Sequence, residues 1–268
     1  MNDTVSPEIP LLLDTTGGIA VVTLNRPRAF NALSSSLLEA LHQAMDQLCA
    51  DPAVRVIVIA GSGKAFCAGH DLKEMQAAHD AAFVQRLFAQ CSELMLKIAR
   101  APVPVIAEVN GMATAAGCQL VAQADLAVAA DHATFAVSGV NLGLFCSTPA
   151  VPLSRVLARK RAAEMLMTGE FIDAQQAVDW GLVNRVAAAS DLRATTLKLC
   201  ATLIAKPRAT LALGKALFNR QLEMGLNAAY QDASAAIACN FLQPEAQEGV
   251  QAFLEKRPAR WPGHEPPA

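Results

Sequence analysis

The sequence predicts an α/β core followed by a helical C-terminal region. Within the first 190 residues, short apolar segments with strand character alternate with amphipathic helical patterns. Beyond about Ala189 only helical patterns remain. Strands separated by helices of this length are typical of βαβ crossovers and a parallel sheet. We therefore expect a core over residues 1–190 and a helical region over residues 191–268, with no low-complexity linker between them.

Apolar runs and turn residues locate the elements of the core. Residues 11–13 and 19–24 are apolar and flank a Gly-rich segment, which predicts a hairpin. A helix is predicted over residues 34–49, because Ser34 can cap it and apolar residues recur there at helical spacing. The other predicted core elements are strands over residues 55–60, 103–109 and 126–130, and a long helix through residues 83–98.

Four helices are predicted after the core. Two of them begin near Pro207 and Pro244, at positions where the first turn of a helix tolerates proline. The four ranges are 191–205, 207–223, 226–241 and 244–255.

Composition excludes several classes of protein. The chain has 268 residues, of which 53% are hydrophobic and 17% charged, so it can bury a sizeable core. Twenty-two Lys and Arg against 24 Asp and Glu give a net charge of -2, which argues against nucleic acid as a partner. No apolar run approaches the ~18 residues of a membrane-spanning helix, so no membrane partner is expected.

Cysteine and histidine usage argues against metal sites and disulfides. The seven cysteines are scattered, and none has C-x-x-C spacing. The five histidines show no ligand spacing either, so we expect no metal. Free thiols, together with a start that lacks a basic or apolar leader, favour a cytoplasmic location.

Two segments, residues 65–75 and 110–120, each follow a predicted strand and are rich in small residues. Such residues let the backbone turn sharply and leave N–H groups pointing outward at the start of a helix. Two N–H groups that converge on one point form an oxyanion hole, to which the helix dipole adds positive potential. The alternative is that these are tight turns whose glycines serve only close packing. The presence of both segments in one chain favours the functional interpretation.

At these segments the sequence resembles the crotonase superfamily, the enoyl-CoA hydratase/isomerase family. The likeness begins at residues 23–33, runs through both turn segments, Asp125 and residues 181–183, and ends at residues 248–257. Within the family, the residues that stand at 69–72, 113–120 and 143–149 are most similar to those of the enoyl-CoA hydratase domain-containing protein 3 subgroup. The resemblance implies an α/β fold, a crotonase-like spiral of ββα repeats with a helical C-terminal trimerisation region.

The resemblance also implies a ligand and an assembly. The ligand would be an acyl-CoA or enoyl-CoA ester, with no separate cofactor because coenzyme A is carried as part of the thioester substrate. The assembly would be a homotrimer or a dimer of trimers. The thioester carbonyl would lie between the backbone N–H groups of His70 and Ala116, with Gly117 opening the helix behind the second donor.

Other matched positions would contact the coenzyme A portion. Arg28, Lys73 and Lys256 are charged, and for each of them an ordinary surface role is equally compatible with the sequence. The segment along the nucleotide and pantetheine would be Arg28, Ala29 and Phe30. The loop around the adenine would consist of Ala68, Asp71, Leu72 and Lys73. Phe241 and Lys256 would cover the coenzyme A, sometimes from a neighbouring subunit.

One departure from the family pattern concerns the two glutamates that hold and ionise the added water in enoyl-CoA hydratases. By alignment they fall at Gln119 and Gly139. An amide can orient a water but cannot take its proton near neutral pH, and glycine has no side chain to offer. The possible substitutes are few, and we consider His70, Glu74, Cys146 and Ser147.

These observations leave two leading hypotheses. The first is an enoyl-CoA hydratase/isomerase-type lyase or isomerase of fatty-acid or acyl-CoA metabolism, with ordinary hydratase activity impaired. The second is a non-catalytic acyl-CoA-binding or regulatory protein of the same fold. A third possibility, an RNA-binding or interaction module, is disfavoured by the net charge and the absence of a basic run.

Overall fold

The computed structural model describes residues 9–261 and contains a six-stranded sheet in the order β1-β2-β3-β5-β7-β10. β1 (Leu11–Thr16) and β2 (Ile19–Leu24) form an antiparallel hairpin, and every other neighbouring pair in this sheet is parallel. The parallel strands are β3 (Val56–Gly61), β5 (Val105–Val109), β7 (Leu126–Ala130) and β10 (Arg185–Ala187). Residues 56–60 of β3 and all of β5 are buried, as expected of parallel strands covered on both faces.

A second, four-stranded sheet lies beside the first, in the order β4-β6-β8-β9. Its strands are β4 (Ala65–Cys67), β6 (Met112–Thr114), β8 (Thr134–Ala136) and β9 (Ile172–Asp173). Phe66 of β4 and Phe135 of β8 are fully buried and are among the largest side chains of the core. This sheet was not predicted, because strands of two or three residues are too short to show a period of two.

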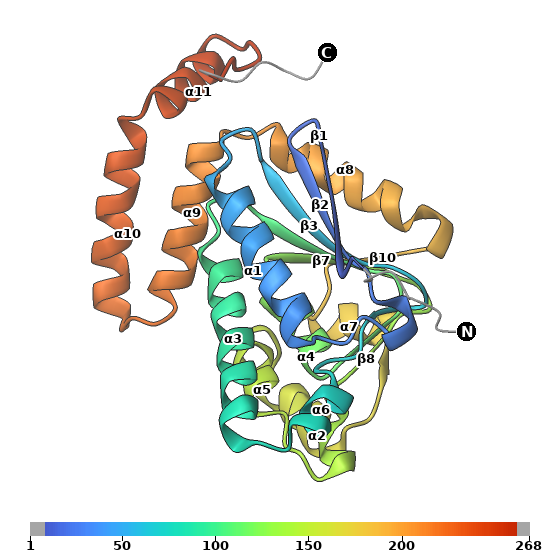
Figure 1. Cartoon of the computed structure of the whole chain (residues 1–268). Helices are drawn as coiled ribbons and strands as arrows, with labels where there is room; N and C mark the ends of the chain where they lie inside the picture. Colours follow the sequence, from blue (N-terminus) through green and yellow to red (C-terminus); the bar gives the residue numbers. More distant parts are fainter. Residues whose placement is uncertain (1–8, 262–268) are drawn as a thin grey trace.

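Helices cover both faces of the large sheet (Figure 1). α1 (Ser35–Ala50) and α3 (Ala81–Arg100) pack against each other on one face, while α8 (Leu192–Ile204) packs on β5 and β7 from the other. Ser34 caps α1 as predicted, since its hydroxyl accepts a hydrogen bond from the N–H of Leu37. The shorter helices near the second sheet are α2 (Leu72–Ala78), α4 (Ala116–Gln123), α5 (Ser147–Val156), α6 (Arg159–Thr168) and α7 (Ala174–Trp180).

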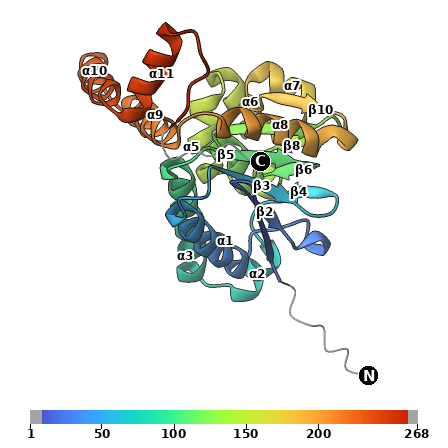
Figure 2. The same ribbon diagram turned by 90° about the horizontal axis from the view of Figure 1, so that it is seen from above.

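The last three helices extend away from the core as an arm, which we define as α9 (Arg208–Gln221), α10 (Leu226–Phe241) and α11 (Pro244–Leu254). Figures 1 and 2 both show α10 separated from the two sheets, with α9 between them. Neither α9 nor α10 has a fully buried residue. The four C-terminal helices match their predicted ranges closely, and the predicted fold class is confirmed.

Candidate active site

Two strand-to-helix turns meet at one place in the fold. The first joins β4 to α2, and the second joins β6 to α4. A Cβ on Gly69 of the first turn would lie 2.9 Å from Ala115 Cβ and 3.2 Å from Ala116 N of the second. A Cβ on Gly117 would lie 2.0 Å from the Cys67 carbonyl oxygen. The two glycines are therefore required for the turns to approach this closely.

Each turn presents a backbone N–H group without a partner among the described residues. Leu33 pairs with His70 in an isolated parallel bridge, whose hydrogen bonds run from Leu33 N–H to Gly69 O and from Asp71 N–H to Leu33 O. In this pattern the N–H of His70 itself points away from Leu33. Ala116 is the first residue of α4, where backbone N–H groups have no partner within the helix.

The backbone is strained immediately before the second of these N–H groups. Ala115 has φ 48° and ψ −117°, a conformation that favours glycine. It is held there because its own N–H donates to the Ala136 carbonyl, at 3.0 Å, and its carbonyl accepts from the N–H of Gln119. Strained non-glycine residues cluster at functional sites, so this geometry marks the start of α4 as a candidate site.

His70 and Ala116 border one cavity of about 410 Å³, and most of its wall is apolar. Of the predicted site residues, Ala68, Leu72 and Gly139 also lie along this wall. Among the described residues that line it, none is an aspartate, glutamate, lysine or arginine. The full wall is Ala68, His70, Leu72, Met75, Val84, Phe88, Ala115, Ala116, Ser138, Gly139, Leu142, Leu144, Phe145, Cys146, Ser147, Thr148 and Pro149.

The His70 side chain belongs to this wall. Its ring lies edge-on to Phe88, with centroids 4.5 Å apart, and neither ring nitrogen has a hydrogen-bond partner. Burial lowers the pKa of His70 to about 4, against weaker opposing effects of the nearby Leu33 carbonyl and the Glu74 carboxylate. The imidazole is therefore neutral near pH 7, which makes it a hydrogen-bonding group and a weak base.

The two positions at which the resemblance places the hydratase glutamates, Gln119 and Gly139, differ in their relation to the cavity. Gln119 is buried in α4, its amide oxygen has no partner, and it does not line the cavity. Gly139 lies in a 3-10 helix (Ser138–Leu142) on the cavity wall. A Cβ there would lie 2.6 Å from Leu144 O and 2.8 Å from Cys146 Sγ. The Cys146 thiol thus occupies the space into which a side chain at position 139 would project.

Two of the other candidate substitutes have structural partners. Glu74 accepts hydrogen bonds from the backbone N–H and the hydroxyl of Ser35, at the start of α1. The Ser147 hydroxyl lies 3.3 Å from the Phe145 carbonyl. Burial raises the pKa of the Cys146 thiol, so it is not an activated nucleophile. His70 is the one substitute whose polar atoms are buried and unpartnered on the cavity wall.

Some of the predicted coenzyme A contacts lie on or beside the first turn. Ala68 donates its N–H to the carbonyl of Phe30, at 3.0 Å, which brings the segment Arg28–Phe30 beside the first turn. Phe30 is 51% exposed, and Lys73 is exposed on α2. Buried Asn31 fixes this segment, because its amide donates to three carbonyls of residues 62–66.

Asp71, a predicted adenine contact, has structural partners. Its carboxylate pairs with Arg26 at 2.9 Å and caps α2 by accepting from the N–H groups of Lys73 and Glu74. Partial burial acts to raise the pKa of Asp71, but hydrogen bonds from Arg26 and Glu74 outweigh it and hold the pKa below its usual value. This side chain therefore positions the first turn and α2.

Phe241 and Lys256 are not brought to the cavity within one chain. Phe241 is the last residue of α10, and Lys256 follows α11, both on the arm. Figure 1 shows α11, and the end of α10 that leads into it, at the top of the view, whereas α2 lies at the bottom. Their predicted contact with the ligand therefore requires a neighbouring subunit.

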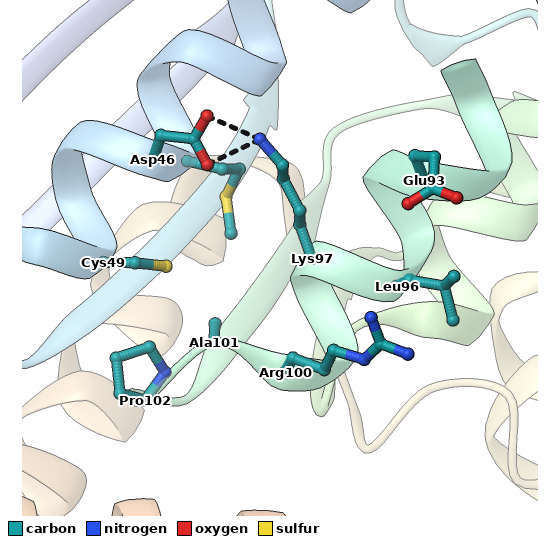
Figure 3. Close-up of a pocket in the computed structure, with 9 residues that line it drawn as sticks. Asp46, Cys49, Glu93, Leu96, Lys97, Arg100, Ala101 and Pro102 are labelled. Atoms are coloured by element: carbon teal, nitrogen blue, oxygen red, sulfur yellow. Dashed lines mark hydrogen bonds and ion pairs between the residues drawn. The ribbon is translucent and has the colours of Figure 1, made fainter.

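A second hollow, of about 200 Å³, lies between α1 and α3 (Figure 3). Lys97 crosses it to contact both carboxylate oxygens of Asp46, at 2.5 Å each, and Glu93 and Arg100 lie along its α3 side. Its wall is charged, unlike that of the larger cavity. In the described range, residues 9–261, no group of His, Cys, Asp or Glu is arranged to hold a metal ion.

The sequence predicts the two turns but does not predict part of the cavity wall. Val84 and Phe88 are one helical turn apart on α3, beside the buried stripe that the periodicity identified. Thr148 lies in the first turn of α5, and Leu144 and Phe145 precede that helix. The available signal was the exposed apolar run 142–145, which has no role in the core.

Comparisons with known proteins identify the family of this chain. Residues 14–264 match the family described as Enoyl-CoA hydratase/isomerase. The enoyl-CoA hydratase domain-containing protein 3, mitochondrial, of Danio rerio is 46% identical over 250 residues, which cover 93% of this chain and 86% of the relative.

Solved structures give the same result. The crystal structure of an enoyl-CoA hydratase from Mycobacterium smegmatis has a TM-score of 0.93 and 56% identity, covering 95% of this chain and 99% of that chain. The structure of human enoyl Coenzyme A hydratase domain-containing protein 3 has a TM-score of 0.91 and 42% identity, covering 94% and 100% of the two chains. The resemblance drawn from the sequence is confirmed, and the chain belongs to the enoyl-CoA hydratase/isomerase family.

Proposed function

We propose that the cavity binds the acyl group of a coenzyme A thioester, whose carbonyl oxygen accepts hydrogen bonds from the N–H groups of His70 and Ala116. The observation that supports this is that both unpaired N–H groups border one apolar cavity, next to the strained Ala115. Two such donors stabilise the negative charge of a thioester enolate, and each contributes roughly 10²–10³-fold in rate. The N-terminus of α4 adds positive potential at the same point.

The coenzyme A portion would lie outside this cavity. Arg28, Ala29 and Phe30 would follow the nucleotide and pantetheine, while Ala68, Leu72 and Lys73 would surround the adenine. Phe241 and Lys256 would come from a neighbouring subunit of a homotrimer or a dimer of trimers. Coenzyme A is part of the substrate in this proposal, so no separate cofactor is needed.

The reaction we propose is of the enoyl-CoA hydratase/isomerase type, with weak hydration or double-bond isomerisation as the chemistry. No carboxylate is found among the described residues that line the cavity, which supports the proposal that the acid and base of a hydratase are missing. Each general acid or base contributes roughly 10²–10⁴-fold. The absence of both also favours the second candidate, an acyl-CoA binder without turnover.

The test is to incubate the purified protein with butyryl-CoA, crotonyl-CoA and free butyrate, measuring binding by calorimetry and products by mass spectrometry. We expect both esters to bind and free butyrate not to bind. We expect crotonyl-CoA hydration to be at least ~10³-fold slower than in a family member with both glutamates. Equal affinity for butyrate and butyryl-CoA would remove the proposal, whereas binding without any product would favour the non-catalytic candidate.

A further inference from the structure

The first turn is held from outside by a separate part of the chain, residues 26–33, which we call the outer segment. Its contacts lie on both sides of His70. The N–H of Leu33 donates to the Gly69 carbonyl at 2.7 Å, and the Leu33 carbonyl accepts from the N–H of Asp71 at 3.1 Å. These two hydrogen bonds hold the backbone of His70 between them.

The outer segment has an unfavourable backbone conformation at its centre. Phe30 has φ 49° and Asn31 has φ 55°, so two consecutive residues other than glycine occupy the left-handed region. Asparagine is enriched in that region, whereas a bulky residue such as phenylalanine is an outlier there. A strained backbone persists only where its surroundings hold it in place. The two residues therefore need a firm attachment to the core.

The Asn31 side chain supplies this attachment. It is fully buried, and its amide nitrogen donates to the carbonyls of Ser62, Ala65 and Phe66, at 2.9, 2.8 and 3.1 Å. Its amide oxygen accepts a hydrogen bond from the N–H of Arg26, at 2.9 Å. Ala65 and Phe66 belong to β4, the strand that leads into the first turn. One amide thus joins the outer segment to that strand.

Arg26 extends the same network to the far end of the turn. Its guanidinium donates to the Ala32 carbonyl at 2.5 Å and to the Asp71 carboxylate at 2.9 Å. Asp71 caps α2, the helix that follows the turn. Asn31 therefore links the outer segment to the strand before the turn, and Arg26 links it to the helix after the turn.

We infer that Asn31 is a positioning residue, whose buried amide sets the place of the His70 N–H group through the outer segment. The inference rests on the proposed function, in which this N–H donates to the thioester carbonyl. Asn31 is not among the described residues that line the cavity, so it acts without touching the acyl group. Because a hydrogen bond weakens steeply when its geometry is poor, a small displacement of the turn reduces the polarisation of the carbonyl.

The experiment measures this polarisation by difference infrared spectroscopy of butyryl-CoA that is isotope-labelled at the thioester carbonyl. Hydrogen bonds from the wild-type site should lower the stretching frequency of the carbonyl when the ester binds. Asn31→Gly keeps the left-handed backbone without strain and removes the amide, so it should lose a large part of this shift. Its affinity for butyryl-CoA should fall by no more than about tenfold, the effect of one hydrogen bond.

Arg26→Met is a second variant, which removes the link to the helix after the turn. The Arg26 side chain is 21% exposed, so this change disturbs the core less than a change at Asn31. It should also reduce the shift of the carbonyl frequency. Circular dichroism checks that each variant is folded.

Asn219→Ala is the matched control. The Asn219 amide also donates to a backbone carbonyl, that of Ala99 at 2.9 Å, but it joins α9 to α3 outside the cavity. This variant should keep the wild-type shift, although urea unfolding should show that it is destabilised. A purely structural role of Asn31 would likewise lower the free energy of unfolding and leave the carbonyl frequency unchanged. The frequency therefore separates positioning from stability.

The outcomes separate the inference from the function on which it rests. If the wild type lowers the carbonyl frequency and folded Asn31→Gly lowers it equally, the inference is wrong and the proposed function stands. If Asn31→Gly does not fold, Arg26→Met decides, because a reduced shift supports the inference and an undiminished shift overturns it. If the wild type does not bind the ester, or binds it without any shift, the proposed oxyanion hole is wrong and the inference falls with it.

Discussion

At the scale of single residues, the site depends on groups whose neighbours determine their chemistry. The His70 ring is neutral because burial lowers its pKa to about 4, while its backbone N–H stays available for a ligand oxygen. Asp71 and Glu74 lie within four residues of it, yet their carboxylates are committed to Arg26, to the start of α2 and to the start of α1. Three ionisable side chains in one short segment thus have three different roles.

The lowered pKa of His70 predicts a dependence of stability on pH. Below the ordinary value of 6.5 the unfolded chain takes up a proton at this position, whereas the folded protein does so only near pH 4. The free energy of unfolding should therefore be unaffected by this group above pH 6.5 and should fall as the pH falls from there towards 4. Between pH 7.5 and pH 5 the loss from His70 is about 2 kcal/mol.

Urea unfolding of the wild type and of His70→Phe at pH 7.5 and pH 5 measures this contribution. Between the two pH values, the free energy of unfolding of the wild type should fall by about 2 kcal/mol more than that of the variant. Equal losses in the two proteins would show that the ring is solvated or paired in the folded state.

Gly139 leads to a second prediction at this scale, because its position leaves no room for the glutamate of a hydratase. A Cβ would meet Leu144 O at 2.6 Å and Cys146 Sγ at 2.8 Å, although the φ angle of Gly139 is not in the left-handed region. Even Gly139→Ala should therefore lower the free energy of unfolding by about 1–3 kcal/mol, as overpacking does elsewhere. Gly143→Ala, with φ 75° and open space around it, should cost only about 1 kcal/mol.

The same contact predicts the result of installing both carboxylates. We expect Gln119→Glu with Gly139→Glu not to restore crotonyl-CoA hydration, because the segment from Leu144 to Cys146 must first move. A kinetic assay on a folded double variant measures this. Full hydration activity would mean that this segment rearranges easily, and that the residues at positions 119 and 139 alone limit hydration in the wild type.

At the scale of elements, side chains of α9 attach the arm to the core through hydrogen bonds to backbone carbonyls at the end of α3 and just before β5. Lys215 of α9 donates to the carbonyls of Ile98 and Val103 and pairs with Asp125 at 2.6 Å. Asn219, one turn further along α9, donates to the carbonyl of Ala99. The last carbonyls of α3, which have no partner within that helix, are satisfied by side chains of α9.

This arrangement predicts that Lys215 contributes more to the free energy of unfolding than an ordinary surface lysine of a helix. The Lys215 side chain is 8% exposed, so Lys215→Met would remove the buried cation that pairs with Asp125 and the donor to the Ile98 and Val103 carbonyls, at a cost of about 3–5 kcal/mol. Lys97→Met is the matched control, because its partner Asp46 is 67% exposed and such pairs contribute ~1 kcal/mol or less. Urea unfolding should show a larger loss of unfolding free energy for Lys215→Met than for Lys97→Met. Equal losses in the two variants would contradict this role of Lys215.

The elements also show how much the sequence could predict. Long periodic segments such as α1, α3 and the four C-terminal helices were placed correctly, because apolar spacing over three or more turns identifies both the type and the buried face of a helix. The second sheet could not be found, since a strand such as Ile172–Asp173 has no measurable period. Its pairing depends on contacts between distant segments.

The site was predictable to a similar extent. Gly69 and Gly117 marked the two turns because close approach of two backbones excludes a side chain. Nothing near Thr148 or Phe88 in the sequence indicates that they line the same cavity, because that follows from how α5 and α3 pack. The engagement of Asp71 with Arg26 was likewise invisible, since it joins residues 45 positions apart.

At the scale of the whole molecule, the arm presents apolar side chains that no other part of residues 9–261 covers. Ile237 is 64% exposed, Leu242 75% and Phe253 82%, and a further hollow between α9 and α10 is lined by Phe218, Leu226 and Tyr230. Apolar exposure of this extent on adjoining helices is typical of a surface that another subunit buries. We therefore expect light scattering at micromolar concentration to detect an oligomer, with a trimer or hexamer as the predicted size.

Under the proposed function, the arm would also link assembly to ligand binding, because Phe241 and Lys256 lie far from the cavity of their own chain. If a neighbouring subunit supplies them, Ile237→Glu together with Phe253→Glu should shift the protein towards the monomer, since buried charges oppose association. The same variant should weaken butyryl-CoA binding, although no residue of the cavity has changed. Met167→Glu places the same charge on α6, at a side chain that is 71% exposed and outside the arm, and should alter neither property. A monomeric variant that binds butyryl-CoA as tightly as the wild type would show that each chain holds the coenzyme A portion alone, and that Phe241 and Lys256 have no part in it.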